Sequence, residues 1–263
     1  MSTTATMIDI IILSNCLNHK VFEMNCNCLQ SLSESETQIE FNVVIMESSI
    51  EFKKQNFQYP KFHNIQLTVQ VAPQPFNFSR NFNIGIKNTS NNYIALCNND
   101  IIFKPNWCSE ILKFAAETPS ALSFCPKNPE SRWTKAKKFH QPTKGYNVRE
   151  EFVGWCYILN RKIFKIIPPL DETFDFYFQD DDFAMTLRKY NINHWMVPSS
   201  NVIHLGGETS SITDGFKYNE KAHIDRTKFH KKWGAQRTIA WKNRLFRYIM
   251  HPLKLGFVSK YIY

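Results

Sequence analysis

The sequence has no apolar run long enough to cross a membrane. The early run Ile8 to Leu13 contains Asp9 and is too short for a span, and the segment Met1 to Met7 lacks the basic residues that open a signal peptide. The seven cysteines are scattered, without a CxxC pair or a compact disulfide framework. We therefore expect a cytoplasmic protein with reduced, mostly buried thiols and with neither a signal peptide nor a transmembrane segment.

Several widespread functional motifs are also missing. The sequence contains neither a Walker A sequence nor a GxGxxG loop, which are the common glycine-rich phosphate-binding motifs. It has no nucleophile elbow, no zinc-finger spacing and no internal repeat. Any phosphate group that this protein binds is therefore expected to be held in another way.

The chain carries an excess of positive charge. Its 32 Lys and Arg residues outnumber 23 Asp and Glu residues, giving a formal net charge of +9, and the excess gathers at Lys127 to Lys144 and from Lys217 to the C-terminus. A basic surface attracts nucleic acid, anionic membranes or phosphorylated small molecules, and charge alone does not choose among them. A length of 263 residues suits one large domain, or a domain with a small appendage.

Short apolar runs alternate with segments of helical length in the first third of the chain. We expect strands at Ile8 to Leu13, Phe41 to Met46, Ile65 to Val71 and Tyr93 to Cys97, with helices at Glu23 to Ser33 and Ser79 to Lys87. This alternation predicts βαβ units and a parallel sheet. Ligands bind beyond the carboxyl ends of such strands, which places Ser14, Glu47 and Asp100 along one rim.

The second half is less regular. Residues Thr118 to Arg149 carry several Pro and Lys residues and are expected to form an irregular connection. Strands are expected at Glu151 to Leu159 and His194 to Val197, with a helix at Asp182 to Tyr190 between them. The segment Tyr218 to Tyr263 is basic, aromatic and expected to be helical.

Asn98, Asn99 and Asp100 follow an expected buried strand and put oxygen ligands at its end. Mg²⁺ and Mn²⁺ prefer such ligands and commonly take one or two carboxylates together with substrate phosphates. An ordinary polar turn is the alternative interpretation, because Asn and Asp are common turn residues.

Gln179 is followed by three acids, Asp180, Asp181 and Asp182, in an aromatic context. Clustered carboxylates repel one another unless a cation or a distinct role separates their pKa values. Asp180 and Asp182 are two positions apart, so they cannot share one face of a helix. One Asp can therefore cap the helix while another faces a cleft as a general base.

Two further residues are candidates for binding. His204 follows an apolar run and precedes two glycines, so it can point into a cleft and ligate a metal, although a structural histidine is the alternative. Arg80 lies near an expected helix N-terminus and can contact a diphosphate, although a surface arginine is the alternative.

Together these segments resemble family 2-type glycosyltransferases of the GT-A fold, in order from Ile8 to about Gly234. The resemblance is carried by VVIMESS at 43–49, RNFNIG at 80–85, YIALCNND at 93–100, FVGWCY at 152–157, LDETF at 170–174, FQDDDF at 178–183 and KWG at 232–234. It implies a GT-A (Rossmann-like) α/β fold with a mixed, mainly parallel sheet flanked by helices. It also implies a glycosyltransferase domain over residues 1–235, divided into a nucleotide-sugar-binding half (1–107) and an acceptor-binding half (108–235). A basic helical C-terminal tail covers residues 236–263.

The resemblance also implies roles for individual residues. Asp100 and His204 are the expected ligands of Mn²⁺ or Mg²⁺, and Asp180 is the expected catalytic base of an inverting transfer. The expected contacts of the nucleotide-sugar donor, which is expected to be UDP-linked, are Ser14, Glu47, Arg80, Asn83, Asn98 and Asn99. The expected contacts of a glycan or other hydroxyl acceptor are Trp155, Gln179 and Asp182.

The sequence departs from the family pattern at three of these positions. Asn98 replaces the first aspartate of the DXD-like motif, Gln179 replaces a glutamate, and Glu47 replaces an aspartate, so an inactive relative is one alternative. A nucleotidyltransferase on a related fold is a second, and a basic binding module is a third. We expect no nucleic-acid partner, and we expect the aromatic and basic tail to pack on the domain or to contact anionic membrane at its periphery.

Overall fold

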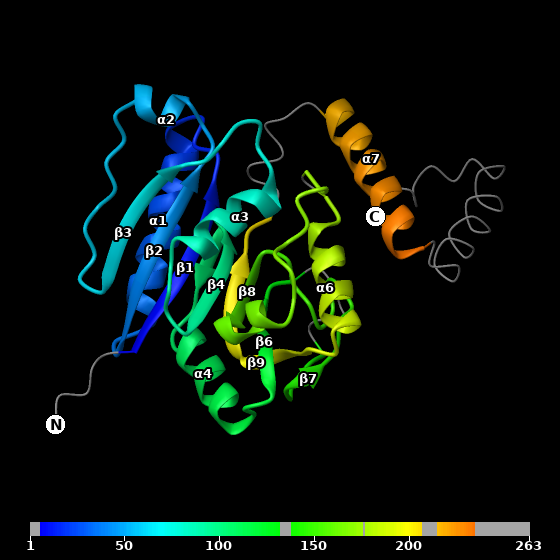
Figure 1. Ribbon diagram of the computed structural model, residues 1–263. Helices are drawn as coiled ribbons and strands as arrows, with labels where there is room; N and C mark the ends of the chain where they lie inside the picture. The colour runs from blue at the N-terminus through cyan, green and yellow to red at the C-terminus, as the bar shows by residue number, and fades with distance from the viewer. Residues whose placement is uncertain (1–5, 132–137, 176, 207–214, 235–263) are drawn as a thin grey trace, which may run out of the picture.

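The computed structural model describes residues 6–131, 138–175, 177–206 and 215–234 (Figure 1). The strands are β1 (Thr6–Ser14), β2 (Ile39–Glu47), β3 (Ile65–Val71), β4 (Tyr93–Asn98), β5 (Ile101–Phe103), β6 (Ala121–Lys127), β7 (Thr143–Lys144), β8 (Cys156–Asn160) and β9 (Asn193–His204). The helices are α1 (His19–Ser35), α2 (Glu51–Lys54), α3 (Phe78–Lys87), α4 (Trp107–Glu117), α6 (Gln179–Lys189) and α7 (Gly215–Trp233), with a short 3-10 helix at Arg161–Lys165.

The strands of the described residues form one mixed, mainly parallel sheet. Its order is β3-β2-β1-β4-β8-β6-β9-β5, and β7 pairs with β9 beside this path. Strands β1 to β4 are mutually parallel, whereas β8 runs antiparallel to both β4 and β6. The expectation of a mixed, mainly parallel sheet is confirmed.

Helices cover both faces of the sheet (Figure 1). One core cluster contains Leu29 of α1 and Ile111 of α4, and the other contains Phe82 of α3 and Leu187 of α6. The central strand β1 is buried on both faces over its last seven residues, which explains its nearly continuous apolar sequence. The carboxyl ends of β1, β2 and β4 therefore meet at one edge of the sheet.

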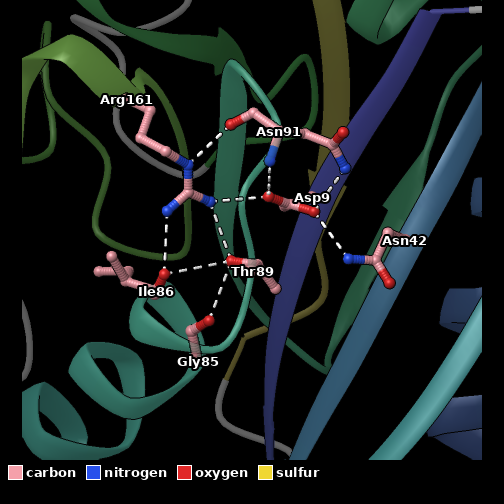
Figure 2. Close-up of polar contacts among 7 residues, drawn as sticks. All are labelled: Asp9, Asn42, Gly85, Ile86, Thr89, Asn91 and Arg161. Atoms are coloured by element: carbon pink, nitrogen blue, oxygen red, sulfur yellow. Dashed lines mark hydrogen bonds and ion pairs between the residues drawn. The ribbon is translucent and has the colours of Figure 1, made fainter.

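The polar residue inside that apolar strand, Asp9, is fully buried and forms a network at the opposite edge of the sheet (Figure 2). Its Oδ2 accepts hydrogen bonds from Arg161 Nη2 at 2.7 Å and from the backbone N–H of Asn91 at 2.8 Å. Its Oδ1 accepts from the side-chain amides of Asn42 and Asn91. Arg161 also donates to the carbonyls of Asn91 and Ile86, so β1, β2, the end of β8 and the end of α3 are joined here.

The expected elements of the first third are confirmed, with ends that differ by a few residues. The expectation of an irregular connection over Thr118 to Arg149 is wrong, because β6 lies within it and pairs with both β8 and β9. Pro126 is tolerated because the register between β6 and β9 is irregular between Pro126 and Lys127. The expected strand at Glu151 to Leu159 begins only at Cys156, since the preceding residues form a loop.

The helix expected at Asp182 starts three residues earlier, at Gln179. The strand expected at His194 to Val197 continues to His204. The helical segment expected from Tyr218 to Tyr263 is confirmed as far as Trp233, where α7 ends. The tail at 236–263 lies outside the described residues. Within the described part of the chain, no helix combines the length and the apolar character that a bilayer crossing requires.

Candidate active site

Glu47 forms a buried acceptor where β1 and β2 end. The parallel register places it beside Ser14, and the N–H of Ser48 donates to the Ser14 carbonyl at 2.9 Å. Its carboxylate Oε1 accepts from the backbone N–H groups of Cys16 (2.9 Å) and Ser49 (2.7 Å). The second oxygen, Oε2, is buried and has no hydrogen-bond partner among the described residues. A fixed carboxylate with one open oxygen is suited to accept a hydrogen bond from a ligand.

Asn25 of α1 forms hydrogen bonds with two of the predicted rim residues, Ser14 and Asn99. Its amide nitrogen donates to Ser14 Oγ at 2.9 Å and to Tyr59 Oη at 2.8 Å, and its Oδ1 accepts from Asn99 Nδ2 at 2.7 Å. Ser14, Asn25 and Asn99 are all buried. Ser14 and Asn99 therefore hold the rim together through Asn25.

Asp100 and His204 meet at the same edge. Strand β5 pairs antiparallel with β9, so that Ile101 lies opposite His204, and the N–H of Leu205 donates to the Asp100 carbonyl at 2.9 Å. His204 Nε2 lies 3.2 Å from Asp100 Oδ1. This oxygen is buried and receives no hydrogen bond from the described residues, so the short distance is not a hydrogen bond.

The pair fits a divalent cation. Two ligand atoms on adjacent corners of an octahedron with bonds of about 2.1 Å lie roughly 3.0 Å apart, close to the spacing seen here. Within the described ranges, no group of three or more His, Cys, Asp and Glu side chains could hold a metal. Asp100 and His204 would therefore supply two ligands, and the remaining positions would fall to substrate phosphates and water.

Trp155, a predicted acceptor contact, lies next to this pair. Its ring stacks on the His204 ring with centroids 5.3 Å apart and planes 11° apart, and its carbonyl accepts from the N–H of Asn98 at 2.9 Å. The stacked indole fixes the orientation of the imidazole. The predicted sugar-stacking residue is thus in contact with a predicted metal ligand.

Asp180 lies against Gly154, the residue before Trp155. A Cβ atom placed on Gly154 would come within 2.6 Å of Asp180 Cβ and 2.8 Å of its Oδ2, so the close approach requires glycine. Burial raises the pKa of Asp180, against the lowering effects of the Asp181 N–H and of Arg149. A carboxylate with a raised pKa is a better proton acceptor near neutral pH, as a general base requires.

Asp181 interacts electrostatically with the Asp180 carboxylate. Its backbone N–H donates to Asp180 Oδ1 at 3.0 Å. Burial and the Asp180 carboxylate raise the pKa of Asp181 to about 7, while Arg149 lowers it. Two adjacent carboxyl groups of this kind lose their protons in two linked steps.

Arg80 and Asn83 of α3 are bound to nearby backbone. Arg80 Nη2 donates to the carbonyls of Pro73 (2.9 Å) and Pro75, which lie in the loop after β3. Asn83 exchanges hydrogen bonds with the backbone of Leu170 and donates to Glu172 Oε1 at 2.9 Å. Both side chains therefore hold neighbouring segments of the chain in place.

Asp182 faces away from Asp180 and is 3% exposed. Its carboxylate accepts from Lys232 Nζ at 2.7 Å and from Trp233 Nε1 at 2.6 Å, so its partners in the structure belong to α7. Together with Gln179, whose Oε1 is buried without a hydrogen-bond partner in the described residues, it borders a cavity of about 360 Å³. The cavity lies between α3, α6, α7 and the 168–172 segment.

Asn25, Gly154 and Arg149 were not predicted as site residues from the sequence. For Asn25 a signal was present, because it interrupts the apolar stripe of α1 that includes Val21, Leu29 and Leu32. A polar residue on a buried helix stripe usually has a specific hydrogen-bond partner. Gly154 gives no such signal, since its importance depends on a helix 26 residues later in the chain.

Comparison with known proteins gives a family and a fold. A model described as Glycosyl transferase family 2 matches residues 23–194, and no curated protein sequence matches. Among solved structures, the chain is similar to GalNAc-T7 with UDP, GalNAc and Mn²⁺, with a TM-score of 0.56 and 9% identity over 75% of this chain and 43% of that one. It is also similar to S. aureus TarS 1-349, with a TM-score of 0.49 and 12% identity over 74% of this chain and 61% of that one.

This chain spans less than two thirds of either of these structures. At 9% identity, the likeness to GalNAc-T7 shows the fold alone. The family match covers more than half of the chain, including the ends of β2 and β4 and the whole of α6. The chain therefore belongs to glycosyl transferase family 2, as its resemblance to these enzymes implied.

Proposed function

We propose that this glycosyltransferase is a metal-dependent, inverting enzyme of the hexosyltransferase type. It moves a sugar from a nucleotide-diphosphate sugar, with UDP as the nucleotide, to a hydroxyl group of a glycan or other acceptor. The observation that carries the proposal is the buried Asp100 Oδ1, which receives no hydrogen bond from the described residues and lies 3.2 Å from His204 Nε2 at the edge where β4 and β9 end. The GalNAc-T7 structure of similar fold contains UDP and Mn²⁺, which supports the same donor class here.

The donor would bind in the 1–107 half. Glu47 Oε2, which has no hydrogen-bond partner among the described residues, would accept from an N–H of the base, and the bonds of Ser14 and Asn99 with Asn25 would keep the rim in place. Asn98 offers an amide oxygen in place of the usual carboxylate, so the cation would depend on Asp100, His204 and the donor's phosphates. When bound, Mn²⁺ or Mg²⁺ supplies positive charge that stabilises the departing nucleoside diphosphate.

The acceptor would bind in the 108–235 half. Asp180 takes the proton from the acceptor hydroxyl as its oxygen attacks the anomeric carbon from the side opposite the diphosphate. The new glycosidic bond forms as the bond to the diphosphate breaks, which inverts the anomeric centre. Trp155 and Gln179 would contact the acceptor, while Asp182, as the contacts above indicate, would hold α6 in place.

Arg80 and Asn83 would act on the donor indirectly. The guanidinium of Arg80 fixes the carbonyls of the loop after β3, and the amide of Asn83 fixes the 170–172 segment. Their substitution would weaken donor binding by loosening these loops. This proposal modifies the simpler expectation of direct contact with the diphosphate.

The proposal is tested by incubating the protein with a panel of nucleotide sugars, with and without Mn²⁺, and measuring the release of nucleoside diphosphate. We expect metal-dependent release from at least one UDP-sugar, lost in Asp180→Asn but with donor binding retained. The exposed Glu130→Gln variant removes one negative charge elsewhere and should behave as the wild type. Normal turnover in Asp180→Asn would reject the base, and release of pyrophosphate from nucleoside triphosphates would reject the reaction class.

A further inference from the structure

Helix α7 lies against the start of α6, the helix that carries the proposed base (Figure 1). Lys232 Nζ contacts the carboxylates of Asp182 and Asp171, each at 2.7 Å. Trp233 Nε1 donates to Asp182 Oδ1 at 2.6 Å. Both oxygens of Asp182 are therefore held by the last turn of α7, because Lys232 also donates to its Oδ2 at 3.0 Å.

A second set of contacts holds the residues just before α6. Asp225 of α7 is 1% exposed, and its Oδ2 accepts from the backbone N–H of Tyr177 at 3.0 Å. The ring of Phe229 packs on that of Phe178, with centroids 5.4 Å apart. The guanidinium group of Arg226 also lies over the Phe178 ring, 5.9 Å from the ring centroid. Helix α7 thus grips the chain on both sides of Asp180, at residues 177–178 and at residue 182.

The N-terminus of α6 has no side-chain N-cap hydrogen bond, which is the usual way in which a helix end is stabilised. Its N-cap residue, Phe178, is left-handed (φ 63°, ψ 4°) and provides no side-chain cap hydrogen bond. An ordinary N-cap side chain stabilises a helix end by about 1 kcal/mol. Here the first turn contains three acids instead, and its orientation depends on contacts from α7.

The geometry of the first turn of α6 links the α7 contacts at Asp182 to the position of Asp180. Residues two positions apart on a helix point about 200° apart, so Asp182 and Asp180 face opposite sides. The structure agrees, because Asp182 points to α7 while Asp180 packs on Gly154. A shift of the turn toward or away from α7 would therefore move Asp180 relative to the loop that carries Trp155.

We propose that Lys232 and Trp233 are positioning residues for the base, acting on Asp180 through Asp182. The inference rests on the proposed function in taking Asp180 as the base. It assigns a role to the KWG sequence, which lies outside the 23–194 family match. Rate is sensitive to such placement, since a misplacement of about 1 Å can cost on the order of 100-fold in turnover.

The test compares Lys232→Met with Lys231→Met, which removes the same charge from the adjacent, exposed position. At a temperature where both variants are folded, we expect Lys232→Met to lower kcat by about 10- to 100-fold, with the donor KM within about twofold of the wild type. Lys232→Arg, which keeps the cation, should recover part of the loss. Amide hydrogen exchange should become faster at residues 180–183 in Lys232→Met and remain unchanged in Lys231→Met.

The two readouts separate the possible failures. If the wild type transfers sugar but Lys232→Met keeps a kcat within twofold of the wild type, the positioning role is wrong and the proposed function stands. An equal fall in kcat for Lys232→Met and Lys231→Met would also overturn it, as would unchanged exchange at residues 180–183. If the wild type turned over no donor, the proposed function itself would fail, and hydrogen exchange would still show whether α7 holds α6.

Discussion

The ion pair between Asp9 and Arg161 allows a quantitative prediction about stability (Figure 2). The Asp9 carboxylate is 0% exposed, and the Arg161 side chain is 22% exposed. Removing one partner of a buried pair typically costs about 3–5 kcal/mol, because a charge is left without compensation. Arg161→Met leaves the fully buried Asp9 charge without its partner, and the carbonyls of Asn91 and Ile86 also lose a hydrogen bond. We therefore expect it to lower the free energy of unfolding by about 3–5 kcal/mol.

Asp9→Asn should be less costly, at about 2–3 kcal/mol, because the remaining guanidinium reaches water and keeps its hydrogen bonds to Asn91, Ile86 and Thr89. The double variant should be less destabilised than the sum of the single variants by about 1–3 kcal/mol, since either substitution alone already breaks the pair.

Urea unfolding at pH 7 measures these free energies, provided that the slope with denaturant stays constant. The exposed neighbour Lys162 gives the matched control, and Lys162→Met should change the free energy of unfolding by less than about 0.5 kcal/mol. A cost below about 1 kcal/mol for Arg161→Met, or strict additivity in the double variant, would refute the reasoning. The network lies at the edge opposite Asp100, so kcat per folded molecule should not change.

Gly154→Ala should lower kcat about 10- to 100-fold and cause a modest loss of stability, because the new Cβ would lie 2.6 Å from the Cβ of Asp180. Steady-state kinetics and thermal unfolding measure the two effects, and an unchanged kcat would contradict the close packing of Gly154 on Asp180. Burial lowers the pKa of His194 to about 3, so the unfolded chain binds the extra proton first and stability is lost as pH falls from about 6.5 toward 3, by up to roughly 4 kcal/mol. The raised pKa of Asp181 acts in the opposite direction between about 4 and 7, so the test is the difference between the wild type and His194→Gln, which should lose less stability on acidification. Asn25→Leu should destabilise the fold by about 1–3 kcal/mol in urea unfolding, because buried Ser14 and Asn99 lose their partner; a neutral effect would show that the bonds are replaced by water.

The sheet and its rim could be predicted from the sequence. Apolar strands such as β1 and β2 are visible as runs, and Glu47 and Asp100 follow from where those runs end. Strand β6 was not predicted because Pro126 and the flanking Pro and Lys residues suggest a loop, whereas pairing with β8 and β9 stabilises it as a strand. Its pairing is decided by tertiary structure, which local sequence does not encode.

The directions of side chains were less predictable than their positions. Spacing shows that Asp180 and Asp182 face apart, but only packing decides that Gly154 lies on one side and Trp233 on the other. The sequence did not predict that Arg80 donates to backbone carbonyls, since the course of the loop after β3 has no sequence signal. Contacts between segments far apart in the chain account for each of these differences.

The central claim is that Asp100 and His204 bind a divalent cation together with a nucleoside diphosphate. Calorimetric titration of UDP into the protein, with Mn²⁺ or with a chelator, measures this directly. We expect Mn²⁺ to tighten UDP binding at least tenfold in the wild type, and not in Asp100→Asn or His204→Ala, while the exposed Glu117→Gln control on α4 keeps the effect. Equal UDP affinity with and without Mn²⁺ in the wild type, or an undiminished Mn²⁺ effect in Asp100→Asn, would contradict the account.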